Sequence, residues 1–412
     1  MTENRRLLIL IGGHFANAPR PQKEAAVAVE SGFRVTVMGL WTDSTLARED
    51  EKLAESLGVE FEPLLDLTKP SLQGFLARAR TRFASFAFQK FNLTLPESYG
   101  ITARHMFQAA KKLGPDLIMV HSEAGLWAGK RLLDSGYKVG VDFEDWFSED
   151  LPPEARKSRP IYRLKRLEHH LLQHSSLSLA TTDAMGNALV VSSGCKRRPV
   201  TIPNTFPVVI KKEENSPATD ESAPVRFYWF SQTIGPGRGL EPLAQALEEV
   251  TGSWELHIRG NKRSYTDWFE ETFQDLPEGR VILHSTVPNE ELSHASSLYD
   301  VGLALENFRI RNRDLTATNK IFEYLRSGLA VIATDTSGQL EVMERCREAG
   351  VIVRCNEHEE LVTALQHFID NREALASAQR AALKAATTTW AWDQFATRLS
   401  QSLKMASSQI AC

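Results

Sequence analysis

Short apolar runs alternate with helix-like segments twice along this chain of 412 residues, and this alternation restricts the fold more than any other feature. Each run has the length of a buried strand, and each intervening segment is long enough for a helix that crosses back over a sheet. Such alternation predicts a parallel sheet. The runs of the first half lie at residues 7–11, 34–38, 59–61, 117–120, 138–142, 177–180 and 200–202, and those of the second half at 225–230, 255–258, 281–283, 301–305, 329–333 and 351–353.

A polar, proline-bearing stretch at residues 211–217 (KKEENSP) interrupts this alternation between the two halves. We therefore predict an α/β protein with two domains. The N-terminal Rossmann-like domain would comprise residues 1–205, the linker 206–224, and the C-terminal Rossmann-like domain 225–390, while residues 391–412 form a helix that could pack back on the N-terminal domain. Two such domains facing each other would enclose a cleft at the carboxyl ends of their strands, where open parallel sheets bind ligands.

The composition is that of a water-soluble globular protein, with 42% hydrophobic and 24% charged residues. The formal net charge of -4 argues against general nucleic-acid binding. The four cysteines are scattered, without a C-x-x-C pair or a matching histidine spacing. This pattern favours neither a disulfide framework nor a zinc site, and it suits a reducing cytoplasm. The first apolar run is too short for a signal peptide or a membrane span, so we expect a cytoplasmic protein without a membrane-spanning segment.

Residues 318–328 (TNKIFEYLRSG) open a helix with polar groups and close it with glycine, directly before another apolar run. The free amides and the dipole of a helix N-terminus favour an anion, and Lys320 adds a full positive charge there. Glu323 lies one turn deeper, where its carboxylate could accept hydrogen bonds from two neighbouring hydroxyls, as on a ribose. Gly328 can adopt the left-handed conformation that ends a helix. The alternative is an ordinary amphipathic helix before a strand.

A glycine-rich segment follows the first strand of the second half, at residues 235–240 (GPGRGL). Gly237 and Gly239 would let the backbone approach a ligand, and Arg238 can make charge-assisted hydrogen bonds to a phosphate. A plain flexible turn with a solvated arginine is the alternative. Arg259, at the end of the next strand, could add a second cation, although a strand-terminal arginine is often only a surface charge.

In the first half, polar residues also follow buried strands, at positions that lie at the carboxyl edge of a parallel sheet. Gly12 and Gly13 would let the chain approach a diphosphate or an acceptor, and His14 follows them. His121 ends one strand, and residues 142–146 (DFEDW) end the next. The alternative for Gly12 and Gly13 is a tight turn, and for His121 it is a surface histidine whose hydrogen bonds are already made. The acids of residues 142–146 could simply cap the next helix.

The two-domain organisation and the stretch NKIFEYLRSGLAVIA at residues 319–333 together resemble the glycosyltransferase family 4-like enzymes of the GT-B fold. The resemblance covers nearly the whole chain. It implies two Rossmann-like domains that face each other across a cleft, with the nucleotide-sugar donor bound by the C-terminal one. It also implies that Glu323 binds the ribose hydroxyls and that Thr318, Asn319 and Lys320 lie near the diphosphate.

The same resemblance assigns roles outside this helix. The arginine of the glycine-rich segment would bind phosphate, and the loop that contains Thr286 and Val287 would hold the nucleobase through backbone groups, unless it is only a polar strand-to-helix connection. A histidine comparable to His121 and an acid near Asp145 approach the transferred sugar in the family. Where a His-Asp pair is common, this chain has Glu144-Asp145. GT-B enzymes generally need no bound divalent ion, so we expect no metal and no cofactor besides the donor substrate.

Two departures from the family pattern concern the donor. The family carries paired glutamates eight positions apart, but the position eight before Glu323 is Leu315, and the acids nearby are Asp314 and Glu306. A basic residue is also common where this chain has Thr233. The loop at residues 308–315 contains three arginines, which could contact an acidic sugar or a charged acceptor or could simply be solvated.

From these observations we predict a retaining, metal-independent glycosyltransferase of the hexosyltransferase type. It would move a sugar from a nucleotide diphosphate sugar to a saccharide or lipid-linked acceptor, in the synthesis of a cell-surface polysaccharide or glycoconjugate. A sugar-nucleotide epimerase of GT-B type and a non-catalytic saccharide-binding or scaffold protein are the alternatives.

Two basic stretches suggest contact with a membrane surface. Residues 78–91 mix cations with aromatic side chains, and residues 156–166 are rich in Lys and Arg. Anionic lipid would attract such a face, which predicts peripheral contact at the inner membrane. The alternative is that the aromatic side chains of this helix pack in the core.

Overall fold

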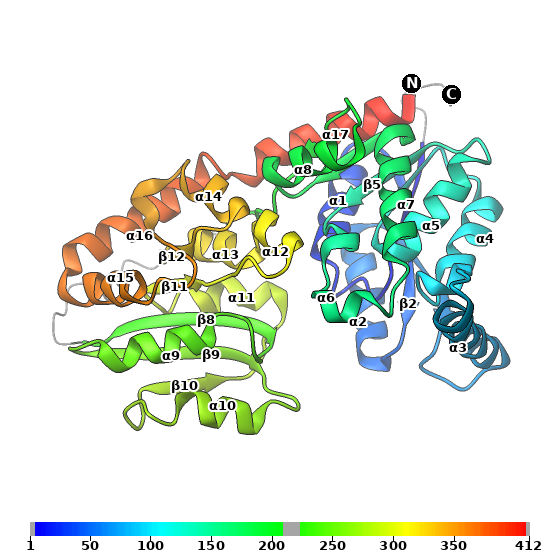
Figure 1. The fold of residues 1–412 in the computed structure, drawn as a ribbon. Coiled ribbons are helices and arrows are strands. Elements are labelled where there is room, and N and C mark those ends of the chain that lie inside the picture. Colours follow the sequence, from blue (N-terminus) through cyan, green and yellow to red (C-terminus); the bar gives the residue numbers. More distant parts are fainter. Residues whose placement is uncertain (1–4, 209–222, 409–412) are drawn as a thin grey trace. The chain divides into compact units, whose positions relative to one another are not determined.

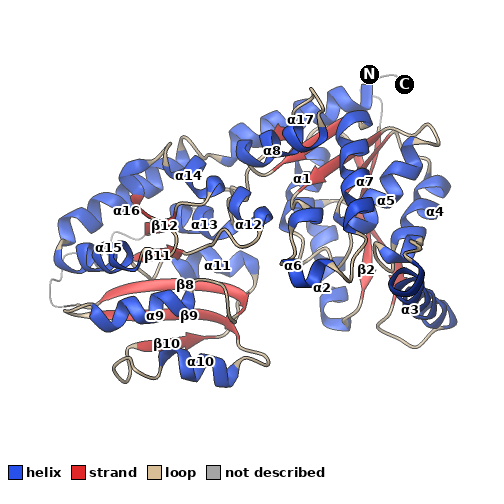
Figure 2. Ribbon diagram, in the orientation of Figure 1, coloured by secondary structure: helices blue, strands red, loops and turns tan. Residues whose placement is uncertain are grey.

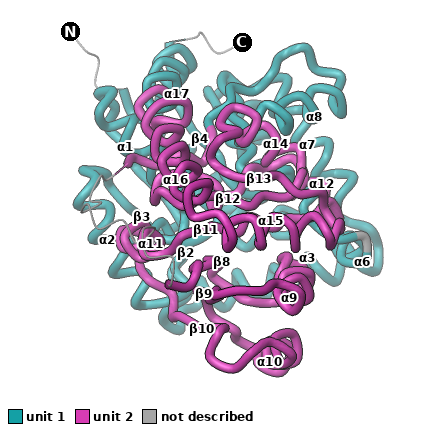
Figure 3. The backbone as a smooth tube through the Cα atoms, turned by 90° about the vertical axis from the view of Figure 1, so that its left-hand side faces the viewer, with its two compact units in different colours: residues 1–202, 395–412 teal, residues 203–394 magenta. Residues whose placement is uncertain are grey.

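The structure is a computed structural model that describes residues 5–208 and 223–408 (Figure 1). The chain divides into two compact units, coloured separately in Figure 3. The first unit comprises residues 1–202 and 395–412, and the second comprises residues 203–394. Most of the predicted linker, residues 206–224, lies outside the described residues.

The first unit is built on a parallel sheet of seven strands within the described residues, with helices on both sides (Figure 2). The strand order is β3-β2-β1-β4-β5-β6-β7, so the chain moves outward from β1 in both directions. The strands are β1 (Arg6–Leu10), β2 (Arg34–Trp41), β3 (Glu60–Asp66), β4 (Leu117–Val120), β5 (Val139–Phe143), β6 (Leu177–Ala180) and β7 (Val200–Thr201), and the helices are α1 (Pro19–Glu30), α2 (Ser44–Leu57), α3 (Leu72–Phe91), α4 (Ala103–Leu113), α5 (Ser122–Leu133), α6 (Pro153–Arg156), α7 (Ile161–His174) and α8 (Asp183–Ser193).

The central strands of this sheet are mainly apolar because helices cover both of their faces. In β1, Leu7, Leu8, Ile9 and Leu10 are all buried. The edge strand β3 is longer than the predicted strand at residues 59–61, because the polar stretch that continues it still buries Leu64 and Leu65. Its proline is tolerated because an edge strand leaves one side without ladder partners.

The second unit contains a parallel six-stranded sheet in the part of the chain that the structure describes, in the order β10-β9-β8-β11-β12-β13. Both predicted parallel sheets are therefore confirmed. The strands are β8 (Val225–Thr233), β9 (Trp254–Asn261), β10 (Val281–His284), β11 (Val301–Ala304), β12 (Ala330–Thr334) and β13 (Gly350–Val353), and the helices are α9 (Leu240–Glu249), α10 (Thr266–Phe273), α11 (Asn289–Ser296), α12 (Arg311–Leu315), α13 (Asn319–Ser327), α14 (Ser337–Met343), α15 (His358–Asp370) and α16 (Arg372–Thr387).

Helix α13 packs unusually close to strand β11 because Gly302 has no side chain. A Cβ atom at Gly302 would lie 2.2 Å from the ring of Tyr324, which is fully buried and donates a hydrogen bond from its hydroxyl to the Leu303 carbonyl. Gly328 ends α13 with a φ of 71°, which confirms the predicted left-handed cap. This packing fixes where the N-terminus of α13 lies relative to the sheet.

The last helix, α17 (Trp392–Ser408), begins in the second unit, and its residues from Phe395 onward belong to the first. These residues pack through hydrogen bonds, such as those from Arg5 to the Ser407 hydroxyl (2.8 Å) and from Lys138 to the Ser407 carbonyl (2.7 Å). Each helix of the described residues is too short or too polar to span a bilayer.

Candidate functional site

In the second unit, the N-terminus of α13 presents polar groups at the carboxyl edge of the sheet. Thr318 is the N-cap residue, yet its side chain makes no capping hydrogen bond. Its hydroxyl oxygen is buried and has no hydrogen-bond partner within the described residues. Asn319 is exposed and Lys320 is half-buried. The unpaired hydroxyl beside free helix amides is an arrangement that can receive an anion.

Lys320 is held by an acid that follows strand β11. Its Nζ lies 2.7 Å from Oε1 of Glu306, and the two side chains are only 12% and 8% exposed. The same ammonium lies 5.5 Å from the centre of the Trp229 ring. A buried pair of this kind fixes the position of both charges, because separating them would leave a charge buried alone.

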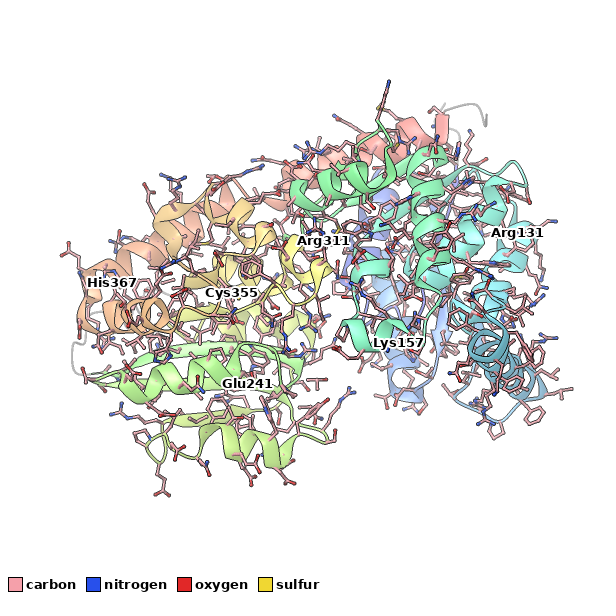
Figure 4. All side chains as sticks on the ribbon, viewed as in Figure 1. Arg131, Lys157, Glu241, Arg311, Cys355 and His367 are labelled. Atoms are coloured by element: carbon pink, nitrogen blue, oxygen red, sulfur yellow. The ribbon has the colours of Figure 1, made fainter. Side chains whose placement is uncertain are left out.

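The glycine-rich loop between β8 and α9 contains two residues in the left-handed conformation, Gly237 (φ 71°) and Gly239 (φ 83°). A Cβ atom at Gly239 would lie 2.4 Å from the Leu305 carbonyl oxygen, so this position requires glycine for two reasons. The Gly237 amide donates to Oε1 of Glu241 at 2.9 Å, and Figure 4 labels this glutamate on α9. The loop is therefore held in one conformation.

Arg238 lies in this loop, half-buried, and donates to the Ser231 hydroxyl at 3.0 Å. Burial lowers the pKa of Arg238, and the neighbouring charge of Arg313 lowers it further, while Glu306 opposes this. The guanidinium of Arg313 donates to the Gly237 carbonyl at 3.3 Å. Arg238 and Arg313 therefore bring two positive charges to the same loop, and such a pair of cations can bind an anion.

The predicted departure from the family's paired glutamates is visible in the structure. Leu315 is buried at the end of α12 and offers no polar group. The preceding carboxylate, on Asp314, accepts a hydrogen bond from the Ser337 amide at 2.8 Å. The acid that does lie among the cations of this edge is Glu306, the second residue after β11.

Glu323 lies on α13, 1% exposed, and both of its carboxylate oxygens have partners. Arg326 donates from its Nε to Oε2 at 2.9 Å, and the Ser327 hydroxyl donates to Oε1 at 3.1 Å. The guanidinium of Arg326 also lies 4.5 Å from the centre of the Phe206 ring. Because each carboxylate oxygen has two lone pairs, Glu323 retains the capacity to accept hydrogen bonds from a diol.

Arg259 is 9% exposed and is engaged within the fold, unlike the solvated cation that sequence reasoning allowed. It donates from Nε to the Tyr228 hydroxyl (3.0 Å) and from NH1 to the Ser285 carbonyl (2.7 Å). Burial raises the pKa of Tyr228 to about 12. Arg259 thereby anchors the loop in which Thr286 is exposed and Val287 half-buried.

In the first unit, His14 is engaged at both ring nitrogens. Nδ1 lies 2.8 Å from Oδ2 of Asp50, and Nε2 accepts from the amides of Thr42 (2.9 Å) and Asp43 (3.2 Å). The ring therefore ties the loop after β1 to α2. A Cβ atom at Gly12 would lie 2.9 Å from the Ser122 side chain, at the start of α5. The predicted acceptor roles of Gly12, Gly13 and His14 stay predictions.

His121 ends β4 within a buried cluster of charged groups. Its Nε2 lies 3.0 Å from Oε2 of Glu24, and Arg20 donates to both oxygens of Asp142, at 2.7 and 2.9 Å. Although burial lowers it, the pKa of His121 is raised well above its ordinary value because Glu24 and Glu144 carry negative charge beside it. Burial raises the pKa of Glu24 to about 7, against the pull of His121. The negative charges beside His121 therefore favour its protonated form.

The ligand atoms of Glu24, His121 and Asp142 lie within 4.8 Å of one another, a spacing that could hold a metal ion. However, Arg20 already supplies a bidentate cation to Asp142, and protonated His121 supplies a second positive charge to Glu24. A divalent ion would have to compete with both. We therefore describe this group as a buried ion cluster.

Glu144 and Asp145 are half-buried in the loop that follows β5. Oε2 of Glu144 lies 3.5 Å from Nδ1 of His121, an ion-pair distance that is too long for a hydrogen bond. The loop is anchored by Glu168 of α7, which accepts from the Ser148 amide at 2.9 Å and from Nε1 of Trp146 at 3.2 Å.

Sequence reasoning named Glu306 without giving it a role and counted Arg313 among three arginines that could contact an acidic sugar or a charged acceptor. It missed Glu24 entirely. Glu306 could have been found as the first polar residue after a buried strand, the rule that selected His121. Arg313 and Glu24 lie on helices, and neither position carries a local signal of its contacts. The pairing of Glu24 with His121 joins residues 97 positions apart in the sequence.

Comparison with known proteins finds a family match within the second unit. Residues 226–371 match the family model described as Glycosyl transferases group 1. No curated protein matches the chain in sequence.

Solved structures match nearly the whole chain at low identity. One is Anabaena Alr3699/HepE in complex with UDP-glucose, at a TM-score of 0.70 and 16% identity, covering 97% of this chain and 99% of that one. Another is sucrose-phosphate synthase from Thermosynechococcus elongatus, with a TM-score of 0.69 and 14% identity. The match covers 97% of this chain and 98% of that one. A putative UDP-N-acetylglucosamine 2-epimerase from Listeria monocytogenes matches with a TM-score of 0.54 and 12% identity. This match covers 95% of this chain and 96% of that one. The chain has the GT-B fold, as predicted.

Proposed function

We propose that this chain is a retaining, metal-independent glycosyltransferase that moves a sugar from a nucleoside diphosphate sugar to a saccharide or lipid-linked acceptor. The observation that carries the proposal is the set of cations at one edge of the second sheet. Arg238, Arg313 and Lys320 gather there with the N-terminus of α13, and Glu306 is the acid that pairs with Lys320. This arrangement lies inside the matched family domain.

The chemistry follows from the charge that develops during transfer. The bond between the anomeric carbon and the β-phosphate oxygen breaks, and the nucleoside diphosphate leaves with an additional negative charge. Fixed cations and helix amides stabilise that charge without reorganising, which is the largest contribution in many enzymes. The acceptor oxygen bonds to the anomeric carbon, and its proton passes to the departing phosphate.

We propose further roles for the residues that the family resemblance assigns to the donor and the transferred sugar. Glu323 would accept hydrogen bonds from the ribose hydroxyls, held in place by Arg326 and Ser327. Thr286 and Val287 would hold the base through backbone groups. On the first unit, we propose that His121 donates a hydrogen bond from Nδ1 to a sugar hydroxyl, with Glu144 and Asp145 beside it.

Calorimetric titration with UDP-, GDP- and ADP-sugars tests the donor site, with Arg238→Ala as the site variant. We expect one donor to bind and the variant to weaken it by at least tenfold, because a charge-assisted contact to phosphate contributes about 1.5–3 kcal/mol. Arg347→Ala, at an exposed arginine of the same unit, is the matched control and should leave the affinity unchanged. Failure of every donor to bind, or equal binding by both variants, would contradict the proposal.

The two alternatives give different outcomes in a turnover assay. An epimerase would convert the bound nucleotide-sugar with no acceptor present, and the likeness to a putative epimerase makes this control necessary. A non-catalytic protein would bind nucleotide and release no nucleoside diphosphate with any acceptor. The proposed transferase releases nucleoside diphosphate only when an acceptor is added.

We also propose a cytoplasmic location and a product that is a cell-surface polysaccharide or glycoconjugate. Free thiols at Cys195, Cys346 and Cys355 support a reducing compartment. Analysis of the glycans lost on deletion of the gene tests the product class.

A further inference from the structure

Helix α3 of the first unit turns its large apolar side chains outward and its small ones inward. Its buried residues are Gly74, Ala77, Ala84 and Ala87. Ala77 packs against Leu40 and Leu65, so the inner face is part of a formed core. The outer side chains are exposed by between 42% and 75%; they are Leu72, Phe75, Leu76, Phe83, Phe86 and Phe91. Residues of this size are normally the ones that a helix buries.

Most of these outer residues share one face of the helix. Leu72, Phe75, Leu76, Phe83 and Phe86 follow one another at spacings of three, one, seven and three, which places them on one stripe along about four turns. We call this set the α3 stripe. Figure 1 shows α3 at the margin of the first unit. Large apolar side chains that are exposed together on one helix face are typical of an interaction site.

The charged residues of helix α3 itself all have one sign. Residues 72–91 contain no Asp or Glu, while Arg78, Arg80, Arg82 and Lys90 are all exposed. Helical spacing puts Arg78 and Arg82 on one flank of the stripe and Arg80 on the other. The basic flanks stand out in a chain whose formal net charge is -4.

We propose that the α3 stripe docks onto an anionic membrane surface, with its phenylalanines inserted among the acyl chains and its flanking cations at the lipid headgroups. Apolar insertion and attraction to anionic lipid act together in interfacial helices. A second copy of this chain fits less well, because a two-fold contact through the stripe would bring the cations of both copies together. This docking does not depend on the proposed transfer reaction.

Flotation of the full chain with vesicles tests the proposal, comparing phosphatidylcholine alone with phosphatidylcholine that contains phosphatidylglycerol. We expect binding to the anionic vesicles that weakens as salt is raised. Phe83→Ser with Phe86→Ser should lower the partition coefficient at least tenfold, since each buried phenylalanine contributes roughly tenfold or more. Arg78→Gln with Arg82→Gln should lower it severalfold per charge, and only on anionic vesicles.

Val191→Ser is the matched control, because Val191 is 83% exposed in the same unit but lies on α8. It should bind vesicles like the unchanged chain. Because all substituted side chains are exposed, the variants should keep their thermal unfolding midpoints, which separates lost docking from lost folding. Equal binding to neutral and anionic vesicles, or undiminished binding by the Phe83 and Phe86 variant, would overturn the proposal. Self-association in sedimentation velocity that this variant abolishes would instead identify the stripe as a dimer interface and overturn it too.

Discussion

Glu168 should make the stability of this protein fall as the pH rises. Burial raises the pKa of this carboxyl to about 7, although hydrogen bonds from Ser148 and Trp146 oppose the shift. The ordinary pKa of a glutamate is 4.5. Between pH 4.5 and about pH 7 the folded chain therefore holds a proton that the unfolded chain releases. The stabilisation is complete below the unfolded pKa and is lost as the pH rises through the folded one. From pH 5 to pH 8 the loss amounts to about 2.5 kcal/mol.

Glu168→Gln removes this titration and keeps a hydrogen-bond acceptor for the Ser148 amide. Unfolding in urea, followed by tryptophan fluorescence, gives the free energy of unfolding at pH 5 and pH 8 for both chains. We expect the variant to gain about 2.5 kcal/mol on the unchanged chain over this interval, whatever constant offset the substitution brings. Glu55→Gln, at an exposed glutamate of the same unit, should show no such gain. Parallel pH curves for the unchanged chain and the Glu168 variant would refute the reasoning.

Three further substitutions test other parts of the molecule. Glu24→Gln removes a negative charge that favours protonated His121, so the histidine pKa measured by NMR should fall. Any loss of turnover on the alkaline side should then begin at lower pH. An unchanged pKa would contradict the interaction between Glu24 and His121. Gly239→Ala should lower the free energy of unfolding by about 2–4 kcal/mol, because the strain of a positive φ adds to a clash with the Leu305 carbonyl. Gly279 has a similar φ but open space around it, so Gly279→Ala should lower the free energy of unfolding by only about 1 kcal/mol in the same urea experiment. Arg326→Leu should lower the thermal unfolding midpoint and weaken nucleotide binding, because the Glu323 carboxylate is left buried without a cation. Unchanged nucleotide binding would argue against the ribose role of Glu323.

The sheet architecture could be predicted because most central strands are short, mainly apolar runs bounded by turn residues. Strand positions and the glycine cap at Gly328 depend on neighbouring residues, which the sequence displays directly. The helix that contains Lys320 could be predicted for the same reason, because its polar start and its terminal glycine lie close together in the sequence. The pairing of Lys320 with Glu306 could not be predicted, since the two residues belong to different elements that only the fold brings together.

Side-chain environment was harder to predict than chain direction. The aromatic residues of α3 could have packed in the core, and the periodicity alone does not say which face of an amphipathic helix turns inward. Here the small residues turn inward, so the core alternative is wrong for Phe75, Phe83 and Phe86. The hydrogen bonds of His14 could not be predicted either, because they join its ring to Asp50 and to two amides that are distant in the sequence.

The close packing of Gly302 against Tyr324 has a consequence for how this domain can change in evolution. Any side chain at Gly302 would enter the space of the ring, whereas a smaller residue at Tyr324 would leave a void beneath the helix. Each single substitution is therefore harmful, and a larger residue at one position becomes acceptable only after a smaller one has appeared at the other. The two positions are expected to vary as a pair among homologous chains, and the order of the two mutations is constrained.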